Sequence, residues 1–330
     1  MKRHTTQPLF TFGRIVPAIS LVFYSLLFTP PALARETGSP TPEGLLPHFE
    51  SLIALGIVLA AVVIAWLLNH RAPKARAGGT FVGALSCLAM IIWFALIIQT
   101  GVLETPKPHQ APMDAAKPAL LWIQMIVISF VGLGLLLVAY KQSQSSEELV
   151  LSAVNEVDRY GRTSRILHWT TAILFIFMIP TGIFASMIPE DAWFRTEYSV
   201  VHKTIGFIIL GLFVARMVWN RKSKRPGLDT SLKPVERKLA HGAHIGLYVL
   251  MLAVPVTGYV MTSLHGYPSF FFALKLEPFL PESDAYILWG LLHKYLLQYL
   301  VYIILGAHIL GALKHHFVDE HKEAFKRMVG

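Results

Sequence analysis

Four histidines lie within or at the ends of strongly apolar segments of this sequence: His168, His202, His293 and His308. Histidine is costly in a membrane, where it usually marks a ligand, a proton path or a hydrogen-bonded helix contact. Two facing imidazoles can hold a metal ion or a haem iron between two helices. For any one of them alone, a simpler interpretation is an interfacial residue bonded to a lipid headgroup or a carbonyl. The depths of the four residues decide between these interpretations.

The spacing of the last two histidines places one near each surface of the membrane. His293 and His308 share one apolar segment and are fifteen residues apart, since 308 − 293 = 15. In an α-helix this spacing corresponds to roughly 22 Å along the axis and only about 60° around it. One face of the helix therefore offers an imidazole at each depth. Matching depths pair His202 with His293 near the outer surface, and His168 with His308 near the inner surface.

The chemistry predicted for these pairs is haem binding. Zinc and copper sites usually combine histidine with carboxylate or thiolate ligands in one place, whereas these pairs are far apart. Cys87 is the only cysteine and no Cys-x-x-Cys-His run occurs, so a haem would be held without thioether bonds. Two b haems at two depths would let an electron cross the membrane. Gly206 and Gly306 are small enough to let a porphyrin face approach the helix, although glycine in membrane helices serves helix packing equally well.

Basic residues near the inner pair are candidate partners for the haem propionates. Arg162, Arg165 and Arg216 lie near the inner ends of their segments, and guanidinium groups pair well with carboxylates. Their simpler role is to set the topology. On the outer side, Lys203 and Lys294 each adjoin a proposed ligand, so they could hold the outer propionates or attract a small anion.

His244 is a less certain site residue. Together with His241 it lies near the inner end of an apolar segment, where it could bind a propionate, a quinone carbonyl or a transferred proton. It could also replace His168 or His308 as the ligand.

The composition indicates that these histidines belong to a membrane protein. The 330 residues are 54% hydrophobic and only 15% charged, which is too apolar for an ordinary soluble domain. Runs of about 20 apolar residues are long enough to cross a bilayer as helices. The sequence therefore predicts an all-α integral membrane bundle of seven spans, at residues 49–68, 80–100, 119–140, 166–188, 200–219, 240–264 and 288–313.

The distribution of charge predicts how the bundle is inserted. Lys and Arg concentrate in alternate short loops, which the positive-inside rule places in the cytoplasm together with the C-terminus. The net charge of +9 thus indicates topology and not nucleic-acid binding. Residues 1–34 resemble a secretory signal, with Ala32 and Ala34 before the cleavage point; an uncleaved anchor is the alternative. The expected location is the bacterial inner membrane, surrounded by lipid.

A polar, Ser-rich segment at 142–155 predicts a division of the mature chain into two parts. Residues 35–145 would form three membrane helices. Residues 146–330 would form a four-helix domain that carries all four proposed ligands.

Several motifs of the second part are similar to those of a known family. They are RYGRTSRILHW at 159–169, VHKTIG at 201–206, AHGAH at 240–244 and GAH at 306–308. The segment from about 159 to 328 resembles the bacterial cytochrome b561 family of di-haem, four-helix membrane proteins. The resemblance implies that His168, His202, His293 and His308 are the haem ligands, and that the protein exchanges electrons with a quinone pool.

The resemblance leaves the role of the protein open. One possibility is an electron carrier or anchor for a dehydrogenase subunit, and another is an autonomous superoxide:quinone oxidoreductase. A haem-free transporter or assembly anchor is a third. The segment at 48–140 is absent from the short members of the family and has no histidine in its apolar runs, so we expect it to shield the haem domain or to dock a partner.

Overall fold

The computed structural model describes residues 49–99, 117–188, 195–227, 232–319 and 327–328. The proposed signal at 1–34 and its cleavage point lie outside the described residues. Within them, seven helices are long and apolar enough to cross a membrane, which confirms the predicted all-α membrane bundle.

The N-terminal part consists of three long helices, and each corresponds to one predicted span. They are α2 (Phe49–Leu68), α3 (Pro73–Gln99) and α4 (Lys117–Gln144). The α3 helix begins seven residues before its predicted start, at Pro73. Proline is favoured in the first turn of a helix because the missing N–H group would have no partner there.

The C-terminal part contains four further spans. The first three are α5 (Arg162–Ala185), α6 (Arg195–Lys222) and α7 (Pro234–Leu264). The fourth is continuous through α8 (Ala285–Leu291), η4 (Leu292–Leu296) and α9 (Leu297–Phe317). Pro180 and Pro255 lie inside α5 and α7, so neither proline ends its helix.

The fourth of these spans differs from the regular α-helix that the sequence predicted. Its η4 segment, which contains His293, is a turn of π-helix. A π-turn holds one residue more than an α-turn, so the fifteen residues from His293 to His308 rotate around the axis about as far as fourteen α-helical residues would. Fourteen residues give roughly 40° less than four full turns, whereas fifteen give about 60° more. Both angles keep the two imidazoles on one side of the helix.

A short antiparallel hairpin, which the hydrophobicity pattern does not predict, joins α7 to α8. Its strands are β1 (Ser269–Phe271) and β2 (Leu274–Leu276), with Ser269 opposite Leu276. The Thr204 hydroxyl of α6 accepts a hydrogen bond from the Phe272 amide at 3.0 Å. The hairpin thereby connects the end of α7 to the neighbouring helix.

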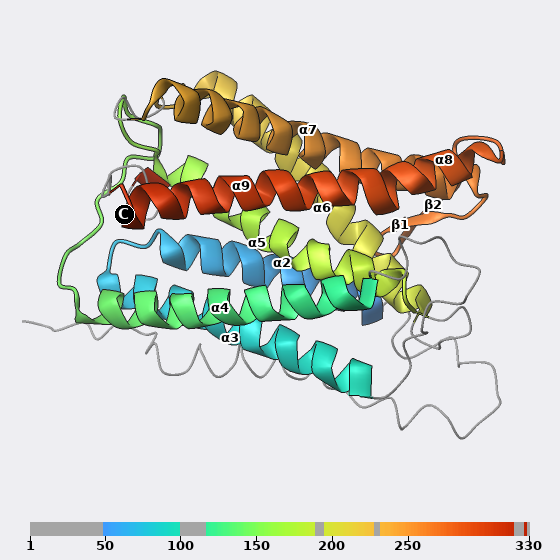
Figure 1. The fold of residues 1–330 in the computed structure, drawn as a ribbon, viewed down its shortest axis with the longest axis horizontal. Helices are drawn as coiled ribbons and strands as arrows, with labels where there is room; N and C mark the ends of the chain where they lie inside the picture. Colours follow the sequence, from blue (N-terminus) through green and yellow to red (C-terminus); the bar gives the residue numbers. More distant parts are fainter. Residues whose placement is uncertain (1–48, 100–116, 189–194, 228–231, 320–326, 329–330) are drawn as a thin grey trace, which may run out of the picture.

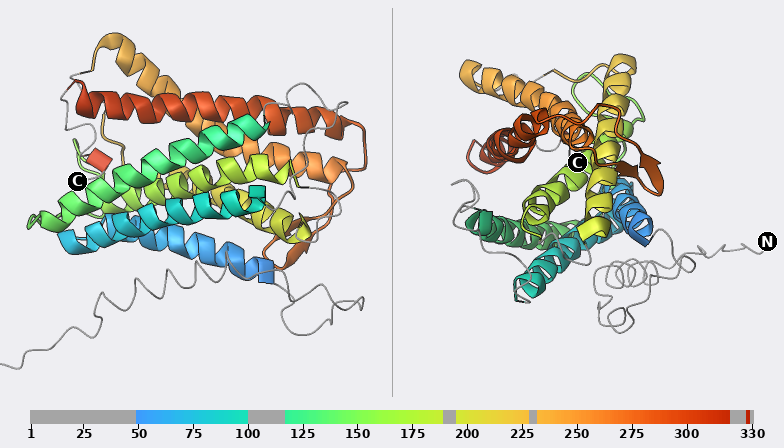
Figure 2. Two further views of the ribbon diagram at one scale, coloured as in Figure 1. Left: turned by 60° about the horizontal axis from the view of Figure 1, so that its bottom comes forward. Right: turned by 90° about the vertical axis from the view of Figure 1, so that its right-hand side faces the viewer.

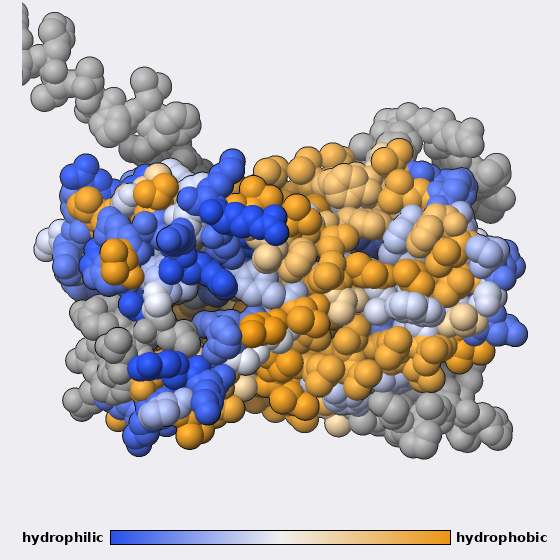
Figure 3. Space-filling view, turned by 90° about the horizontal axis from the view of Figure 1, so that it is seen from above, coloured by the Kyte–Doolittle hydropathy of each residue, from blue (hydrophilic) through white to orange (hydrophobic). Residues whose placement is uncertain are grey.

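The seven spans run side by side along the long axis of the molecule (Figure 1). Helices α7 and α9 lie on one side, α3 and α4 lie on the other, and α5 lies between them (Figures 1 and 2). We call the end that carries the hairpin the outer end, and the opposite end, where α9 terminates, the inner end. The face of the molecule in Figure 3 has a broad apolar band between more hydrophilic ends, as expected for a protein surrounded by lipid.

Two apolar clusters hold the bundle together. The central cluster joins helices of both parts of the chain: Ala61, Leu174, Phe175, Ile205, Ile209, Leu250, Met251 and Val301. The second cluster packs Phe94 of α3 and Leu121 of α4 against Ile183 and Phe184 of α5. The three N-terminal helices therefore share their core with the helices that carry the proposed ligands.

Close packing of α2 against α3 depends on Gly79. A Cβ atom at this position would lie 2.5 Å from the Leu67 Cβ atom and 3.2 Å from the Leu67 backbone carbon. We therefore expect Gly79→Leu to separate the two helices and to destabilise the fold by about 1–3 kcal/mol. Thermal unfolding in detergent measures the effect as a lower Tm.

The matched control is Gly134→Leu in α4, where an added Cβ atom meets nothing within 4 Å. Equal Tm values for the two variants would contradict the proposed packing constraint.

Candidate functional site

The structure brings the four histidines together in two pairs. The ring centroids of His202 and His293 are 6.5 Å apart, and those of His168 and His308 are 6.3 Å apart. One pair lies toward the outer end of the bundle and the other toward the inner end, which is the proximity that the depths predicted. Their role as ligands remains a prediction.

These separations fit a metal ion between two imidazoles. A metal–nitrogen bond is about 2 Å long, and the ring centre lies about 1 Å beyond the nitrogen, so two coaxial ligands place their centroids about 6 Å apart. His244 is closer to His308, at 5.3 Å between centroids. This shorter separation leaves less room for an iron atom, so the geometry favours His168 as the partner of His308.

His293 is oriented by the helix next to it. Its Nδ1 atom donates a hydrogen bond to the Val254 carbonyl of α7 at 2.9 Å, because a carbonyl can only accept. The Thr257 hydroxyl lies 3.3 Å from the same nitrogen. This leaves the Nε2 atom to act as a ligand. Metal-binding histidines typically donate a hydrogen bond from their other ring nitrogen, as Nδ1 does here.

Gly258 makes this arrangement possible. A Cβ atom there would lie 2.8 Å from the Cε1 atom of His293 and 3.1 Å from its Nδ1 atom. Any larger residue would push the imidazole away from the Val254 carbonyl.

Space beside the histidines is suited to a flat group. Gly206 lies one turn after His202, and Gly306 lies two residues before His308. A Cβ atom added at either glycine would meet nothing within 4 Å. Within the described residues, α9 packs along α7 and has no comparable backbone contact with α5 or α6. The donor sets and the open space both fit haem.

A cavity of about 450 Å³ lies beside His244 at the inner end of the bundle. Its lining contains two cations, two phenols and no carboxylate: Tyr160, Asn220, Lys224, Arg225, Pro226, His241, His244, Ile245 and Tyr248. Burial raises the pKa of the Tyr160 phenol, although the nearby positive charge of Arg225 opposes this effect. Tyr160 is therefore a neutral hydrogen-bond donor at neutral pH.

Arg216, which was predicted to lie near the inner histidine pair, belongs to this basic region. Its Nη2 atom donates to the Tyr248 hydroxyl at 3.4 Å, and its guanidinium lies 5.4 Å from the centre of the Tyr248 ring. Arg225 approaches the same ring at 6.0 Å. The inner end of the bundle thus offers positive charge to an anionic group.

The other predicted basic residues are distributed differently. Arg162 is exposed at the start of α5, whereas Arg165 is completely buried and donates from Nε to the Asn69 side-chain oxygen at 2.7 Å. On the outer side, Lys203 donates to the Pro268 carbonyl at 3.0 Å. Arg165 therefore turns toward the N-terminal helices, and Lys203 toward the hairpin.

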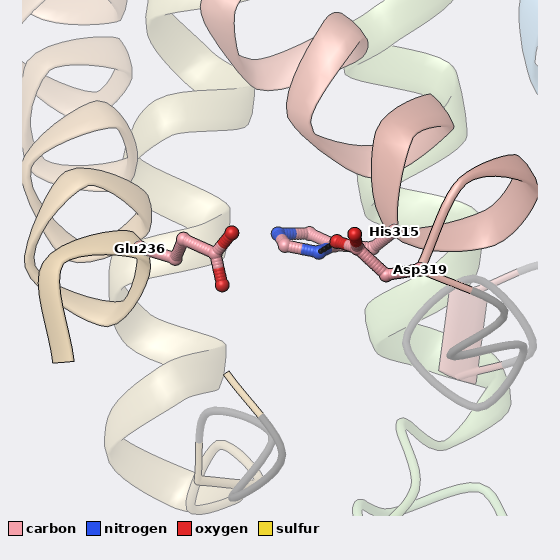
Figure 4. Close-up of side chains that lie close together, drawn as sticks. All are labelled: Glu236, His315 and Asp319. Carbon is pink, nitrogen blue, oxygen red and sulfur yellow. Dashed lines mark hydrogen bonds and ion pairs between the residues drawn. The ribbon is translucent and has the colours of Figure 1, made fainter. Parts of the chain in front are cut away.

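A second polar group joins the inner ends of α7 and α9 through Glu236, His315 and Asp319 (Figure 4). Their ligand atoms all lie within 4.8 Å of one another, close enough for a metal ion. However, the Lys314 ammonium contacts Glu236 at 2.7 Å and Asp319 at 2.5 Å. The hydrogen bond from Lys314 lowers the pKa of the Asp319 carboxyl group. Because Lys314 supplies the positive charge, we interpret the group as an ion-pair network.

Sequence reasoning did not identify several residues that support the histidines. Val254, Thr257 and Gly258 orient His293, while Tyr248 and Arg225 line the inner cavity. All of them lie in apolar or basic runs that look like ordinary membrane helix and topology signal. Only the packing of α7 against η4 and α6 reveals their role.

The fold and the paired histidines define a class of protein, namely a multi-pass helical membrane protein with pairs of histidines between its helices. The sequence model of the prokaryotic cytochrome b561 family matches residues 159–330. The chain belongs to this family.

Curated bacterial relatives agree with this assignment. Cytochrome b561 homolog 2 of Escherichia coli (strain K12) is 32% identical over 183 residues, which are 54% of this chain and 96% of that protein. Cytochrome b561 homolog 1 of the same organism is 22% identical over 173 residues, 52% of this chain and 98% of that protein. The probable superoxide oxidase CybB of Yersinia pestis is 26% identical over 154 residues, 46% and 85% of the two chains.

The family makes this protein a bacterial membrane cytochrome b that transfers electrons. Haem b is the cofactor that the family binds, and the donors and open spaces described above fit it. The matched region contains all four paired histidines. The N-terminal helices lie outside it, so they are an addition to the family's four-helix unit.

Gly258 should be essential for the outer site. We expect Gly258→Leu to displace the His293 ring and to lower the haem content of the purified protein, because the imidazole loses its contact with Val254. Haem per protein, measured from the pyridine haemochrome spectrum, tests this.

Gly182→Leu is the comparison variant, because an added Cβ atom there would lie 3.8 Å from the Cε1 atom of His202, at ordinary contact distance. A haem content that is unchanged in Gly258→Leu would show that His293 does not need this approach.

Proposed function

We propose that the protein holds two b haems, one between His202 and His293 and one between His168 and His308, and passes electrons between them and a quinone pool. One observation supports this above all. A single continuous helix carries an imidazole toward each end of the bundle, and each lies 6.3 or 6.5 Å, between ring centroids, from an imidazole of a different helix, which would leave room for an iron atom.

The chain's own side chains would control the two sites. A haem supplies one-electron chemistry, while the protein fixes its ligands and its surroundings. Val301 of the central cluster lies eight residues after His293 and seven before His308, since 301 − 293 = 8 and 308 − 301 = 7. With Leu174 and Ile205 it fills the layer between the two pairs, which excludes water and fixes their separation.

The basic residues at the inner end would hold the propionates of the inner haem. Arg216 and Arg225 flank Tyr248, and Lys224 lines the same cavity. No carboxylate among the lining residues competes for these cations. The inner cavity is also a place where His244 could deliver a proton to a quinone.

We further propose the topology and division that the charge pattern predicts. The inner end, with the C-terminus, would face the cytoplasm. Residues 35–145 would form the added three-helix part and 146–330 the haem domain. The electron partner would be a quinone, or a dehydrogenase subunit that docks on the protein.

Histidine variants provide the direct test. We expect His308→Ala and His202→Ala each to reduce haem from two per chain to about one, because each removes one axial ligand. A double His168→Ala, His308→Ala variant should still retain about one haem, since both changes affect the same site. Combining His308→Ala with His202→Ala should remove both haems.

His244→Ala is the control within the inner histidine group, and we expect it to retain two haems. If it loses a haem while His168→Ala does not, His244 is the inner ligand. Full haem content in His308→Ala would contradict the proposed function.

A second candidate function is oxidation of superoxide at the outer surface with transfer of the electron to quinone. The relative named as a probable superoxide oxidase supports it, as does the placement of Lys203 next to His202 in the sequence. A positive charge near the outer site would attract the anion.

This alternative predicts that superoxide reduces the haems, and that the rate falls as the salt concentration rises because counterions screen the attraction. Lys203→Gln should lower the rate at low salt and weaken its salt dependence. The comparison variant is Lys275→Gln in the hairpin, whose ammonium is exposed and paired with Glu277 at 2.8 Å. Stopped-flow absorbance measures the rates, and a salt-independent rate would contradict this function.

A further inference from the structure

A fully buried polar pair links the three N-terminal helices to the cytochrome part. The Arg165 Nε atom of α5 donates to the Asn69 Oδ1 atom at the end of α2, at 2.7 Å. Arg165 is 0% exposed and Asn69 is 1% exposed. Apolar contacts alone do not specify how membrane helices associate, because lipid is equally apolar. This polar contact therefore specifies how α2 and α5 associate more than the surrounding apolar packing does.

The orientation of the Asn69 amide is fixed. Its Nδ2 group donates to the Ala65 carbonyl at 2.8 Å, which only the NH₂ side of the amide can do. The oxygen must therefore point at Arg165. Asn69 acts as a rigid acceptor that holds one edge of the guanidinium against the N-terminal helices.

The opposite edge of the guanidinium remains available. The Nη1 and Nη2 atoms of Arg165 are buried and have no hydrogen-bond partner among the described residues. The charges that act on this group in the structure, Arg159 and Arg76, are both positive. A buried guanidinium with two unused donors requires an anion, and a carboxylate is the best geometric match.

The position of Arg165 indicates which carboxylate completes the site. It precedes His168 by three residues on α5, and residues at this spacing are neighbours on a helix surface. A haem at His168 carries propionate carboxylates to this part of the bundle.

We infer that Asn69 is a positioning residue for the inner haem, because it holds the Arg165 guanidinium with its two NH₂ groups, Nη1 and Nη2, available to a propionate. This inference rests on the proposed function. It gives the N-terminal helices a role in the chemistry of the cytochrome. A held cation raises the reduction potential of a nearby haem, because it disfavours the more positive, oxidised state.

The test is a redox titration of the full-length protein, followed by the absorbance of the haems. Asn69→Leu removes the acceptor but keeps the size of the side chain, and we expect it to lower one midpoint potential while the other stays unchanged. Arg165→Gln should lower the same potential further. In the Arg165→Gln background, Asn69→Leu should have no additional effect, because Asn69 acts through the guanidinium.

Gln142→Leu is the matched control. The Gln142 side chain accepts a hydrogen bond from Thr80 at 2.7 Å, so the change removes a polar contact within the N-terminal helices that does not reach α5. Both midpoint potentials should stay as in the unchanged protein.

A second variant keeps the test decisive if Asn69→Leu fails to accumulate. Asn69→Asp retains the acceptor and supplies Arg165 with an anion of its own, so it should also lower one potential. Unchanged potentials in every Asn69 variant obtained would overturn the inference, as would an additional shift in the double variant. If haem content is instead insensitive to His308→Ala, the proposed function itself has failed.

Discussion

The fixed distance between two imidazoles on one helix is the constraint on which the rest of the structure depends. A membrane helix cannot change length, since each of its backbone groups bonds within the segment. The positions of His293 and His308 therefore set the depths at which α5 and α6 must present His168 and His202. The central cluster around Val301 then fills the layer that this separation creates. The inner cavity and the outer hairpin occupy the two ends that remain.

The sequence was sufficient for the architecture because apolar length and the placement of charge are strong signals in a membrane protein. All seven predicted spans correspond to helices, and α2 has the predicted bounds. The proximity of the histidine pairs was also predictable, because depth follows directly from position along a straight helix. These inferences need only spacing and hydropathy.

Other features could not be read from the sequence because they depend on contacts between helices. The π-turn at His293 and the hairpin after α7 leave no distinctive pattern of hydrophobicity. Arg165 was expected near the propionates of the inner haem, but spacing alone does not indicate that its Nε atom bonds to Asn69 of α2. Asn69 itself resembles an ordinary polar residue at the end of a helix. Its importance emerges only when the partner across the interface is known.

The π-turn has one more consequence. It absorbs a single additional residue, so the parts of the helix before and after it are out of phase with each other. During evolution, such an insertion lets one end of a helix be rotated into a new alignment while the other end keeps its neighbours. The outer and inner histidine positions of this helix are therefore separately adjustable, although one continuous rod carries both.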